Sequence, residues 1–458
     1  MSQPHDSAST RPQLAGLTDG SPSAEQTKGD GDPVLLPVTP LIARLSSPIG
    51  ITRPGVRERF ADRAGRLAGQ LSRRLQVGEG AVAAGQVCLS IDPGAADRLA
   101  ARHQVVVVSG TNGKTTTTRM IATAIARSGP VATNRTGANL RNGIVAALLD
   151  GRGRDTAVLE VYEALVPWAV DHLKPAVVVL LNLSRDQLDR YHETDAVSSL
   201  WHRSLGLHSD LAVVANADDP LVVHAASGAR TTWVAAGSEW HLDSTVCPRC
   251  GDQILRHDGT WDCRGCEFTR PEPTVRREGD QIYANGQSIK LQLSLPGDGA
   301  KANAAMAFAA LMVLGRDAVG AVALWADVDD IEGRYSRRLI GAHDVRLTLA
   351  KNPASWNDVL SIIDHDSTPV VIGLNAREQD GCDPSWIWDV PFEQLAGRPV
   401  VCVGERALDL SVRLHYASVE CDVAVDLLEA IERCPDGPVE VVGNYTAFQD
   451  FRTALDRG

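Results

Sequence analysis

An apolar run that ends in a glycine loop is the feature that most constrains this chain. Val105–Val108 is wholly β-branched, as expected of a strand that is buried on both faces of a parallel sheet. The loop after it contains Gly110 and Gly113, and a helical stretch follows at 119–127. Glycines let successive backbone amides point at phosphate oxygens, and the helix presents its positive N-terminal end to the same anion. The segment therefore predicts a nucleotide-binding P-loop in an α/β fold.

The loop and the Lys-Thr-Thr segment that follows Gly113 supply the expected nucleotide contacts. In this pattern Lys114 bridges the outer phosphates, and the hydroxyl of Thr115 is a ligand for Mg²⁺. Val108 stands where the usual P-loop has its leading glycine, so the loop is a variant. The residues that we expect to bind ATP are Gly110, Thr111, Asn112, Gly113, Lys114, Thr115 and Thr116.

Composition favours a soluble, acidic protein. The 458 residues carry 57 acidic and 45 basic side chains, a formal net charge of −12, which argues against a partner recognised through a phosphate backbone, hence against nucleic acid. No stretch approaches the roughly 20 apolar residues that a bilayer span needs, and the first residues lack the pattern of a signal peptide. We expect a cytoplasmic protein with at most peripheral membrane contact.

Strand-like runs alternate with helix-length segments on either side of an interruption at about 240–272, and an alanine-rich helix is expected over 301–314. After the P-loop strand, the expected strands are 157–161, 177–181 and 211–215, and in the last part of the chain 345–349, 370–374, 400–403 and 439–442. This rhythm predicts a central ATP-binding domain with a parallel sheet over 46–330, and a smaller Rossmann-like C-terminal domain over 331–458. Residues 1–45 are rich in Ser, Pro, Gly, Asp and Thr, and we expect a disordered tail there.

A helix is predicted at the start of the central domain. Phe60, Ala64, Leu67, Leu71 and Leu75 recur at helical spacing, and six arginines fall mostly elsewhere. We favour a surface helix that docks on the adjacent domain. The alternative is a basic face that lies near anionic lipid headgroups, close to the inner face of the cell membrane.

Two CxxC pairs occupy the interruption of the α/β pattern. Each pair places two thiolates on one tight turn, and two such turns close a tetrahedral Zn²⁺ site with no open position. We therefore expect a structural zinc ribbon rather than a catalytic metal; the alternatives are coincidence or two disulfides. The expected ligands are Cys247, Cys250, Cys263 and Cys266.

The loop sequence Gly-Thr-Asn-Gly-Lys-Thr-Thr resembles the ATP loop of the Mur ligase superfamily. Three further landmarks occur in the family's order: Glu160 at a strand end, Asn303 in Lys-Ala-Asn-Ala-Ala, and Arg334 in Glu-Gly-Arg. The resemblance implies that they bind Mg²⁺, the nucleotide and the phosphates, respectively. It also implies a reaction in which ATP phosphorylates a carboxylate and an amine attacks the acyl phosphate, with Lys114 and Glu160 as catalytic groups.

The chain departs from the amino-acid-adding members of the superfamily in two places. Only about 65 residues separate the expected tail from the P-loop strand, too few for the N-terminal domain that holds a UDP-sugar. In Asp186-Gln187-Leu188-Asp189, glutamine replaces the histidine that helps to hold a second metal, which leaves a second Mg²⁺ open. His192 is the nearest candidate substitute.

The C-terminal part resembles the synthetase subunits of an amidating branch of this superfamily. The resemblance rests on residues 349–354, 373–389 and 443–446, of which Asp-Pro-Ser-Trp-Ile-Trp-Asp is the most specific. It implies ATP-dependent amidation of the α-carboxylate of D-glutamate in the lipid II stem peptide, with ammonia from a GatD-type glutaminase in a heterodimer. It further implies that Asp383 completes the partner's Cys-His pair. Asp380 and Asp389 rank lower, and Trp386 and Trp388 are expected in the core or at the interface.

Other functions stay open from the residues alone. One is a ligase that adds an amino acid, as folylpolyglutamate or muropeptide synthases do; another is a non-catalytic, nucleotide-gated scaffold. Arg135, Asn139 and Asn142 are candidate contacts for the stem peptide, which is either lipid-linked or part of a soluble precursor.

Overall fold

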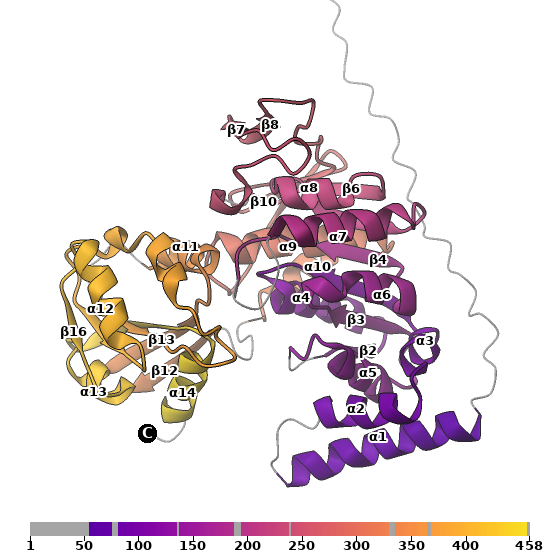
Figure 1. Cartoon of the computed structure of the whole chain (residues 1–458), viewed down its shortest axis with the longest axis horizontal. Coiled ribbons are helices and arrows are strands. Elements are labelled where there is room, and N and C mark those ends of the chain that lie inside the picture. The colour runs from indigo at the N-terminus through magenta and orange to yellow at the C-terminus, as the bar shows by residue number, and fades with distance from the viewer. Residues whose placement is uncertain are drawn as a thin grey trace, which may run out of the picture. The chain divides into compact units, whose positions relative to one another are not determined.

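The computed structural model describes residues 55–75, 81–134, 137–186, 194–237, 240–328, 335–363 and 368–455. These residues form two mainly parallel sheets, each covered by helices, and the predicted α/β fold is confirmed (Figure 1). We call residues 55–328 the P-loop region and residues 335–455 the C-terminal region. Among the described residues, no helix combines the length and apolar character that a bilayer span requires. The tail predicted over 1–45 lies outside the described residues.

The sheet of the P-loop region has nine strands in the order β11-β10-β9-β6-β5-β4-β1-β3-β2. Neighbours from β2 to β9 run parallel, and β9, β10 and β11 form an antiparallel edge that the sequence analysis missed. After β1 the chain forms β2 and β3 on one side of it, and β4 and the later strands lie on the other side. In open α/β sheets, ligands bind at the carboxyl ends of the strands where the strand order reverses in this way, which here is the end of β1. The strands are β1 (Gln104–Ser109), β2 (Val131–Ala132), β3 (Thr156–Glu160), β4 (Val177–Leu180), β5 (Ala212–Asn216), β6 (Arg230–Ala235), β9 (Val275–Glu278), β10 (Gln281–Ala284) and β11 (Gln287–Lys290).

Helices cover both faces of this sheet. Successive side chains of β1 point to opposite faces: Val106 and Val108 join the core beneath α9, and Val105 and Val107 join the core on the other face. Burial on both faces explains why the strand is apolar throughout. The helices are α3 (Ala95–Ala100), α4 (Lys114–Ala126), α5 (Arg141–Asp150), α6 (Val166–Leu173), α7 (Thr194–Gly206), α8 (Pro220–Ala226), α9 (Asp298–Val313) and α10 (Ala318–Trp325), with the 3-10 turn η1 (Glu163–Leu165).

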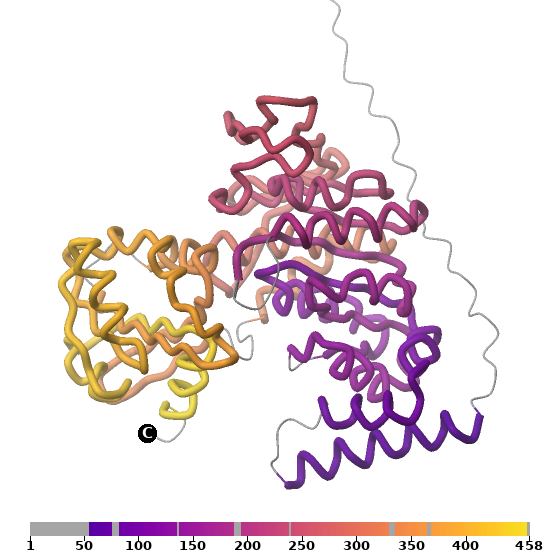
Figure 2. The backbone as a smooth tube through the Cα atoms, viewed as in Figure 1, coloured from indigo at the N-terminus to yellow at the C-terminus, as the bar shows by residue number. Residues whose placement is uncertain are grey.

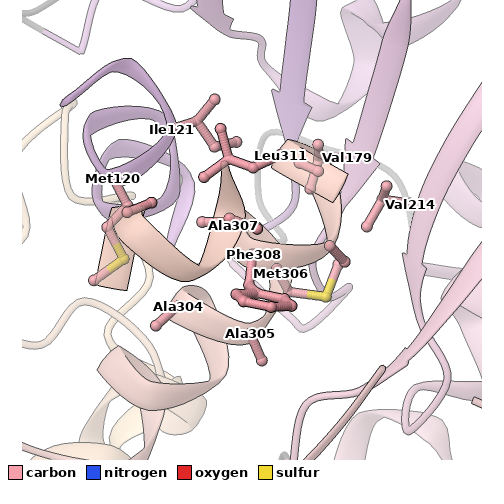
Figure 3. Close-up of a cluster of buried hydrophobic side chains, with 14 of the residues drawn as sticks. Met120, Ile121, Val179, Val214, Ala304, Ala305, Met306, Ala307, Phe308 and Leu311 are labelled. Carbon is pink, nitrogen blue, oxygen red and sulfur yellow. The ribbon is translucent and has the colours of Figure 1, made fainter. Parts of the chain in front are cut away.

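The alanine-rich helix predicted over 301–314 is α9. Its alanines allow close packing, and its larger side chains fill the space next to α4 (Figure 3). Phe308 and Leu311 of α9 belong to the same core as Met120 and Ile121 of α4. This packing brings the start of α9 beside the start of α4, where the P-loop ends.

The C-terminal region has a six-stranded sheet in the order β12-β13-β17-β14-β15-β16. Only β12 runs antiparallel to its neighbour, and all four predicted strands are present. The strands are β12 (Tyr335–Ile340), β13 (His343–Leu349), β14 (Val370–Gly373), β15 (Val400–Val403), β16 (Cys421–Val423) and β17 (Gly437–Gly443). The helices are α11 (Pro353–Ile362), α12 (Ala407–Tyr416), α13 (Leu427–Glu432) and α14 (Tyr445–Leu455), with the 3-10 turns η3 (Ser385–Asp389) and η4 (Phe392–Leu395).

The first two of the three described helices before β1 are α1 (Val56–Arg74) and α2 (Ala81–Ile91), and they stack on α5 (Figures 1 and 2). The predicted docking of α1 on the adjacent structure is confirmed, but its apolar row does not make the contact. The buried positions are small: at Gly65, an added Cβ would lie 2.8 Å from the carbonyl oxygen of Ala84. Phe60 and Leu67 instead stand 62% and 58% exposed.

The segment with the CxxC pairs lies between β6 and β9. It contains the 3-10 turn η2 (Leu242–Ser244) and the antiparallel pair β7 (Ile254–His257) and β8 (Thr260–Cys263). It has a small core of its own, in which Trp261 packs against Phe268 with ring centroids 5.0 Å apart. The Trp261 indole also donates to the carbonyl oxygen of Ala217 at 2.9 Å, which ties this segment to the loop after β5.

Candidate functional site

The P-loop connects β1 to α4, as predicted. Gly110 and Gly113 have φ of +145° and +84°, which side chains rarely tolerate. A Cβ on Gly113 would lie 2.1 Å from Oδ1 of Asn303, so the loop glycine is also required by its neighbour on α9. Asn182, after β4, fixes the loop from the other side: its Oδ1 accepts from the amide of Asn112 at 2.9 Å, and its Nδ2 donates to the carbonyl of Asn112 at 3.1 Å.

Lys114, the first residue of α4, is 4% exposed and its ammonium has three acceptors. Nζ donates to the carbonyl oxygens of Gly110 and Thr111 and, at 2.9 Å, to Oε1 of Glu163. Glu163 begins η1 after β3, and its other oxygen, Oε2, is buried with no hydrogen-bond partner. The sequence analysis did not identify Glu163, although it stands three residues after the predicted Glu160.

The expected Mg²⁺ ligands lie next to each other. Thr115 Oγ1 donates to Oε2 of Glu160 at 2.8 Å, and Nδ2 of Asn139 donates to Oε1 at 3.2 Å. Asn134 fixes the backbone of Glu160 through two hydrogen bonds, of 2.7 and 2.9 Å. A hydroxyl and a carboxylate oxygen at the carboxyl ends of two adjacent strands are ligands that suit a hard divalent cation.

A pocket of about 210 Å³ adjoins the loop, and its lining includes Asn112, Gly113, Thr116 and Asn303. Asn303 thus lies beside the phosphate loop. Across the pocket, residues of the C-terminal region such as Tyr335 also contribute to the lining. The shape of the site therefore provides space beside the phosphate loop for the rest of a nucleotide.

A second pocket, of about 460 Å³, lies along α4 toward β2. Thr115 and Glu160 line one end of it, and Arg119 and Arg154 also contribute to its walls. Thr115 and Glu160 therefore border a space whose walls also contain two arginines. The sequence analysis did not predict this second pocket, since its lining comes from both α4 and β2.

Several predicted site residues lie outside the described residues: Arg334, Gln187, Leu188, Asp189, His192 and Arg135. Asp186 is described, and its carboxylate pairs with Lys351 of the C-terminal region. Asn112 and Asn352 exchange side-chain hydrogen bonds of 3.3 and 3.2 Å. These contacts bring the Lys351-Asn352 segment, which the sequence analysis singled out, to the P-loop.

Asp383 lies apart from these contacts, in an exposed turn before η3. Its Oδ1 accepts from the amide of Ser385 at 2.9 Å, which is the local pairing that a turn aspartate usually makes. Asp380 is buried and accepts from the backbone amide of Thr446 at 2.8 Å, so it supports the fold. Asp389 forms an ion pair of 3.0 Å with Arg185.

Of the two tryptophans in η3, Trp386 packs against the core and Trp388 is 51% exposed. Trp388 continues into an exposed apolar row on α12, where its ring centroid is 5.5 Å from that of Tyr416. Leu408 and Tyr416 of this row are each 71% exposed, and Val412 is 50% exposed. Contiguous apolar surface of this kind marks an interaction site.

The four predicted cysteine ligands come together. Their sulfur atoms all lie within 4.8 Å of one another, with Cys247 and Cys266 at 3.8 Å and Cys250 and Cys263 at 3.4 Å. None of them is disulfide-bonded, which excludes the two-disulfide alternative in this structure. Four sulfur atoms at this spacing can hold a tetrahedral metal ion.

Family models match the two regions separately. The Mur ligase middle domain matches residues 108–311, which include the P-loop and Asn303, and the MurT ligase C-terminal domain matches residues 349–448, which include Asp383. Two similar proteins are both named lipid II isoglutaminyl synthase (glutamine-hydrolyzing) subunit MurT. The one from Staphylococcus aureus is 29% identical over 406 residues, covering 81% of this chain and 92% of that protein. The one from Streptococcus pneumoniae is 27% identical over 432 residues, covering 85% and 96%.

The chain is similar to MurT subunits over 81% and 85% of its length, and it matches both the Mur ligase middle domain and the MurT ligase C-terminal domain. It is therefore an ATP-dependent ligase, as the sequence analysis predicted.

Solved structures confirm the Mur ligase fold. A pseudomurein peptide ligase type C from Methanothermus fervidus superposes with a TM-score of 0.61 at 19% identity, covering 78% of this chain and 79% of that one. MurF from Acinetobacter baumannii gives a TM-score of 0.61 at 17% identity, covering 81% of each chain. At this identity the likeness concerns the fold alone.

Proposed function

We propose that the chain is the synthetase subunit of a lipid II isoglutaminyl synthase in peptidoglycan synthesis. It would transfer the terminal phosphoryl group of ATP to the α-carboxylate of D-glutamate in the stem peptide, and ammonia would displace phosphate from the acyl phosphate to leave D-isoglutamine. The observation that carries the proposal is the arrangement after β1 and β3, in which Thr115 donates to Glu160 and the adjacent Lys114 donates to Glu163.

The reaction brings together two anions, a carboxylate and a triphosphate. Thr115 and Glu160 would hold Mg²⁺, which would neutralise part of the phosphate charge when bound. Lys114 would donate to the outer phosphates, and Arg334 would reach them from the chain segment before β12. Asn303 would contact the nucleotide in the pocket beside Gly113. Mg²⁺, Lys114 and Arg334 would together offset the negative charge that develops during phosphoryl transfer.

The second pocket suits the acceptor. It shares Thr115 and Glu160 with the proposed metal site, and Arg119 and Arg154 in its walls would favour an anionic stem peptide. A carboxylate that entered from this side would meet the phosphoryl group at the metal site. Asn139, which contacts Glu160, would then lie beside the reacting carboxylate.

Ammonia would come from a GatD-type glutaminase, because none of the five cysteines outside the CxxC pairs has a neighbouring motif that marks it as an activated nucleophile. Cys88, Cys402 and Cys434 are buried, and burial raises the pKa of each thiol, that of Cys88 to about 11. Burial likewise raises the pKa of Cys421. A glutaminase cysteine needs a lowered pKa and access to its substrate, so a partner has to supply it.

The exposed row of Trp388, Leu408, Val412 and Tyr416 would receive this partner. The row adjoins η3, whose preceding turn carries Asp383, so a docked glutaminase would have an exposed carboxylate at its edge. A carboxylate orients an imidazole and stabilises it when protonated. Asp383 would serve the partner's Cys-His pair in that way.

The four-cysteine cluster would hold structural Zn²⁺. All four ligand positions would come from the chain, which leaves none for a substrate. The ion would stabilise the segment between β6 and β9, whose own core contains few large side chains.

The central test is amidation by purified components. The chain with its partner, ATP and glutamine should convert the glutamate carboxylate of lipid II to the amide, a change that mass spectrometry detects. The chain alone should do so only with added ammonium. Lys114→Ala should abolish both reactions, whereas Lys174→Ala, a change at the C-terminal end of α6, should leave them intact. Product formation by Lys114→Ala would refute the mechanism.

The role of Asp383 has its own test. Asp383→Asn should abolish glutamine-driven amidation and spare the ammonium-driven reaction, because only the partner's chemistry needs this carboxylate. Asp436→Asn, at another exposed acid of the same region, is the matched control. If Asp383→Asn impairs both reactions equally, its role is different.

The same assay separates the proposal from its rivals. An amino-acid-adding ligase would consume an amino acid and need no glutaminase, so ammonium and candidate amino acids are supplied in parallel. A nucleotide-gated scaffold would show no ATP turnover that depends on the acceptor.

A further inference from the structure

Helix α1 has two faces of opposite character. Its buried residues are Asp62 and three small residues, Ala61, Gly65 and Gly69, and at Gly65 this face packs closely on α2. The opposite face carries large apolar side chains that are more than half exposed: Val56 at 78%, Phe60 at 62%, Leu67 at 58%, Leu71 at 56% and Leu75 at 70%. The helix therefore docks through its small side and presents its apolar side outward.

These apolar residues form one row rather than a scatter. At 100° per residue they fall within an arc of about 100°, and from the first to the last the row is about 29 Å long at 1.5 Å per residue. Single exposed apolar residues need no explanation, but a continuous row on a helix marks an interaction surface.

The charges around the row are mainly positive. Five arginines on α1 and at its end are exposed: Arg57, Arg59, Arg63, Arg73 and Arg74. The two acids of the helix are occupied locally. Asp62 is 5% exposed and pairs with Arg98 at 2.8 Å, and Glu58 accepts from the amide of Gly55 at 2.8 Å. This basic surface stands on a chain whose formal net charge is −12.

We propose that α1 lies flat on an anionic lipid bilayer. The row from Val56 to Leu75 would enter the boundary between headgroups and acyl chains, and the flanking arginines would contact lipid phosphates. Charge decides between this occupant and a second copy of the chain, because two copies would bring their arginines together, whereas an anionic surface attracts them. The proposal does not depend on the ligase assignment, but it would hold the active site near a lipid-linked acceptor.

The test uses the full chain in complex with its partner and sedimentation with lipid vesicles. The complex should bind vesicles of equimolar phosphatidylcholine and phosphatidylglycerol, bind phosphatidylcholine vesicles far less, and lose binding as salt increases. Phe60→Ser/Leu67→Ser/Leu71→Ser should weaken binding by about tenfold or more, because these side chains supply the buried apolar area. Arg59→Gln and Arg63→Gln should each weaken it by about fivefold.

Leu207→Ser/Val319→Ser/Leu339→Ser is the matched control, since these residues are 82%, 51% and 77% exposed elsewhere in the chain. Circular dichroism and ammonium-driven ATP turnover should be unchanged in all variants, which separates this inference from the proposed function. Two results would overturn it: vesicle binding that the α1 triple variant retains, or a wild-type complex that ignores anionic vesicles. A dimer that the triple variant dissociates, without vesicle binding by the wild type, would assign the row to a second copy instead.

Discussion

Glu163→Gln should lower the stability of the protein and raise its affinity for ATP. In the structure, the ammonium of Lys114 donates to two carbonyl oxygens and to Oε1 of Glu163. Lys114 can donate to a phosphate only if it gives up one of these acceptors. Glu163 is the acceptor that also carries a charge, and that charge would repel the incoming phosphates.

The size of the effect follows from the burial of the pair. The side chains of Lys114 and Glu163 are 5% and 11% exposed, so solvent screens their attraction little. Removing one partner of a buried pair costs about 3–5 kcal/mol, but glutamine keeps an acceptor oxygen, and we expect a loss of about 1–2 kcal/mol. In Glu163→Gln, Lys114 donates to a neutral oxygen, and this hydrogen bond is weaker than one to a carboxylate by about 1 kcal/mol. Because Lys114 gives up this bond when it binds a phosphate, ATP should bind about fivefold more tightly.

Calorimetric titration with Mg-ATP and thermal unfolding without nucleotide would measure the two effects. Glu393→Gln is the matched control, because Glu393 also pairs with a buried cation, Arg413 at 2.9 Å, in the C-terminal region. That variant should leave ATP affinity unchanged. If Glu163→Gln weakens ATP binding along with stability, Glu163 organises the loop for the nucleotide and does not restrain Lys114.

Three further predictions follow from other contacts. Gly113→Ala should weaken ATP binding by about tenfold or more, because φ is +84° and the new Cβ would meet Asn303; unchanged titration calorimetry would contradict the loop geometry. Cys247→Ser should release bound zinc, measured by elemental analysis, and lower the melting temperature, whereas purified wild type without metal would exclude a zinc site. Burial, with the charge of His202, lowers the pKa of His224 to about 4 from 6.5, so the unfolded chain binds more protons between these values. The free energy of unfolding should therefore decrease as the pH is lowered from 6.5 toward 4, by up to about 1.4 kcal/mol per pH unit. His224→Gln should reduce this dependence on pH.

The sequence predicted the parts of the fold that local pattern determines. Apolar β-branched runs predicted β1, β3, β4 and β5 to within a residue or two, because buried parallel strands have no polar face. Spacing predicted the cysteine cluster, since each CxxC already places two sulfur atoms together. The edge strands β9 to β11 were missed because half-exposed strands such as Gln287–Lys290 carry mixed residues.

Long-range contacts account for what the sequence could not predict. Nothing near Glu163 indicates that its carboxylate reaches Lys114, since that contact depends on the register of β1 against β3. The orientation of α1 was also unreadable from its own residues. An apolar row normally faces the core, yet here Gly65 allows a closer approach to α2 than Phe60 or Leu67 would permit. The choice of face depends on the partner helix.

The stacking of helices connects α1 to Glu160, the proposed ligand of Mg²⁺. At Gly85 of α2, an added Cβ would lie 1.7 Å from the carbonyl oxygen of Asn142, so α2 and the first turn of α5 are in direct backbone contact. Three residues before Asn142, Asn139 donates to the carboxylate of Glu160. A helix held on a lipid surface would thus be joined through two close-packed layers to the loop that positions the metal ligand. The surface that binds lipid and the site that activates the carboxylate would then keep a fixed separation, which is what an enzyme with a membrane-anchored acceptor requires.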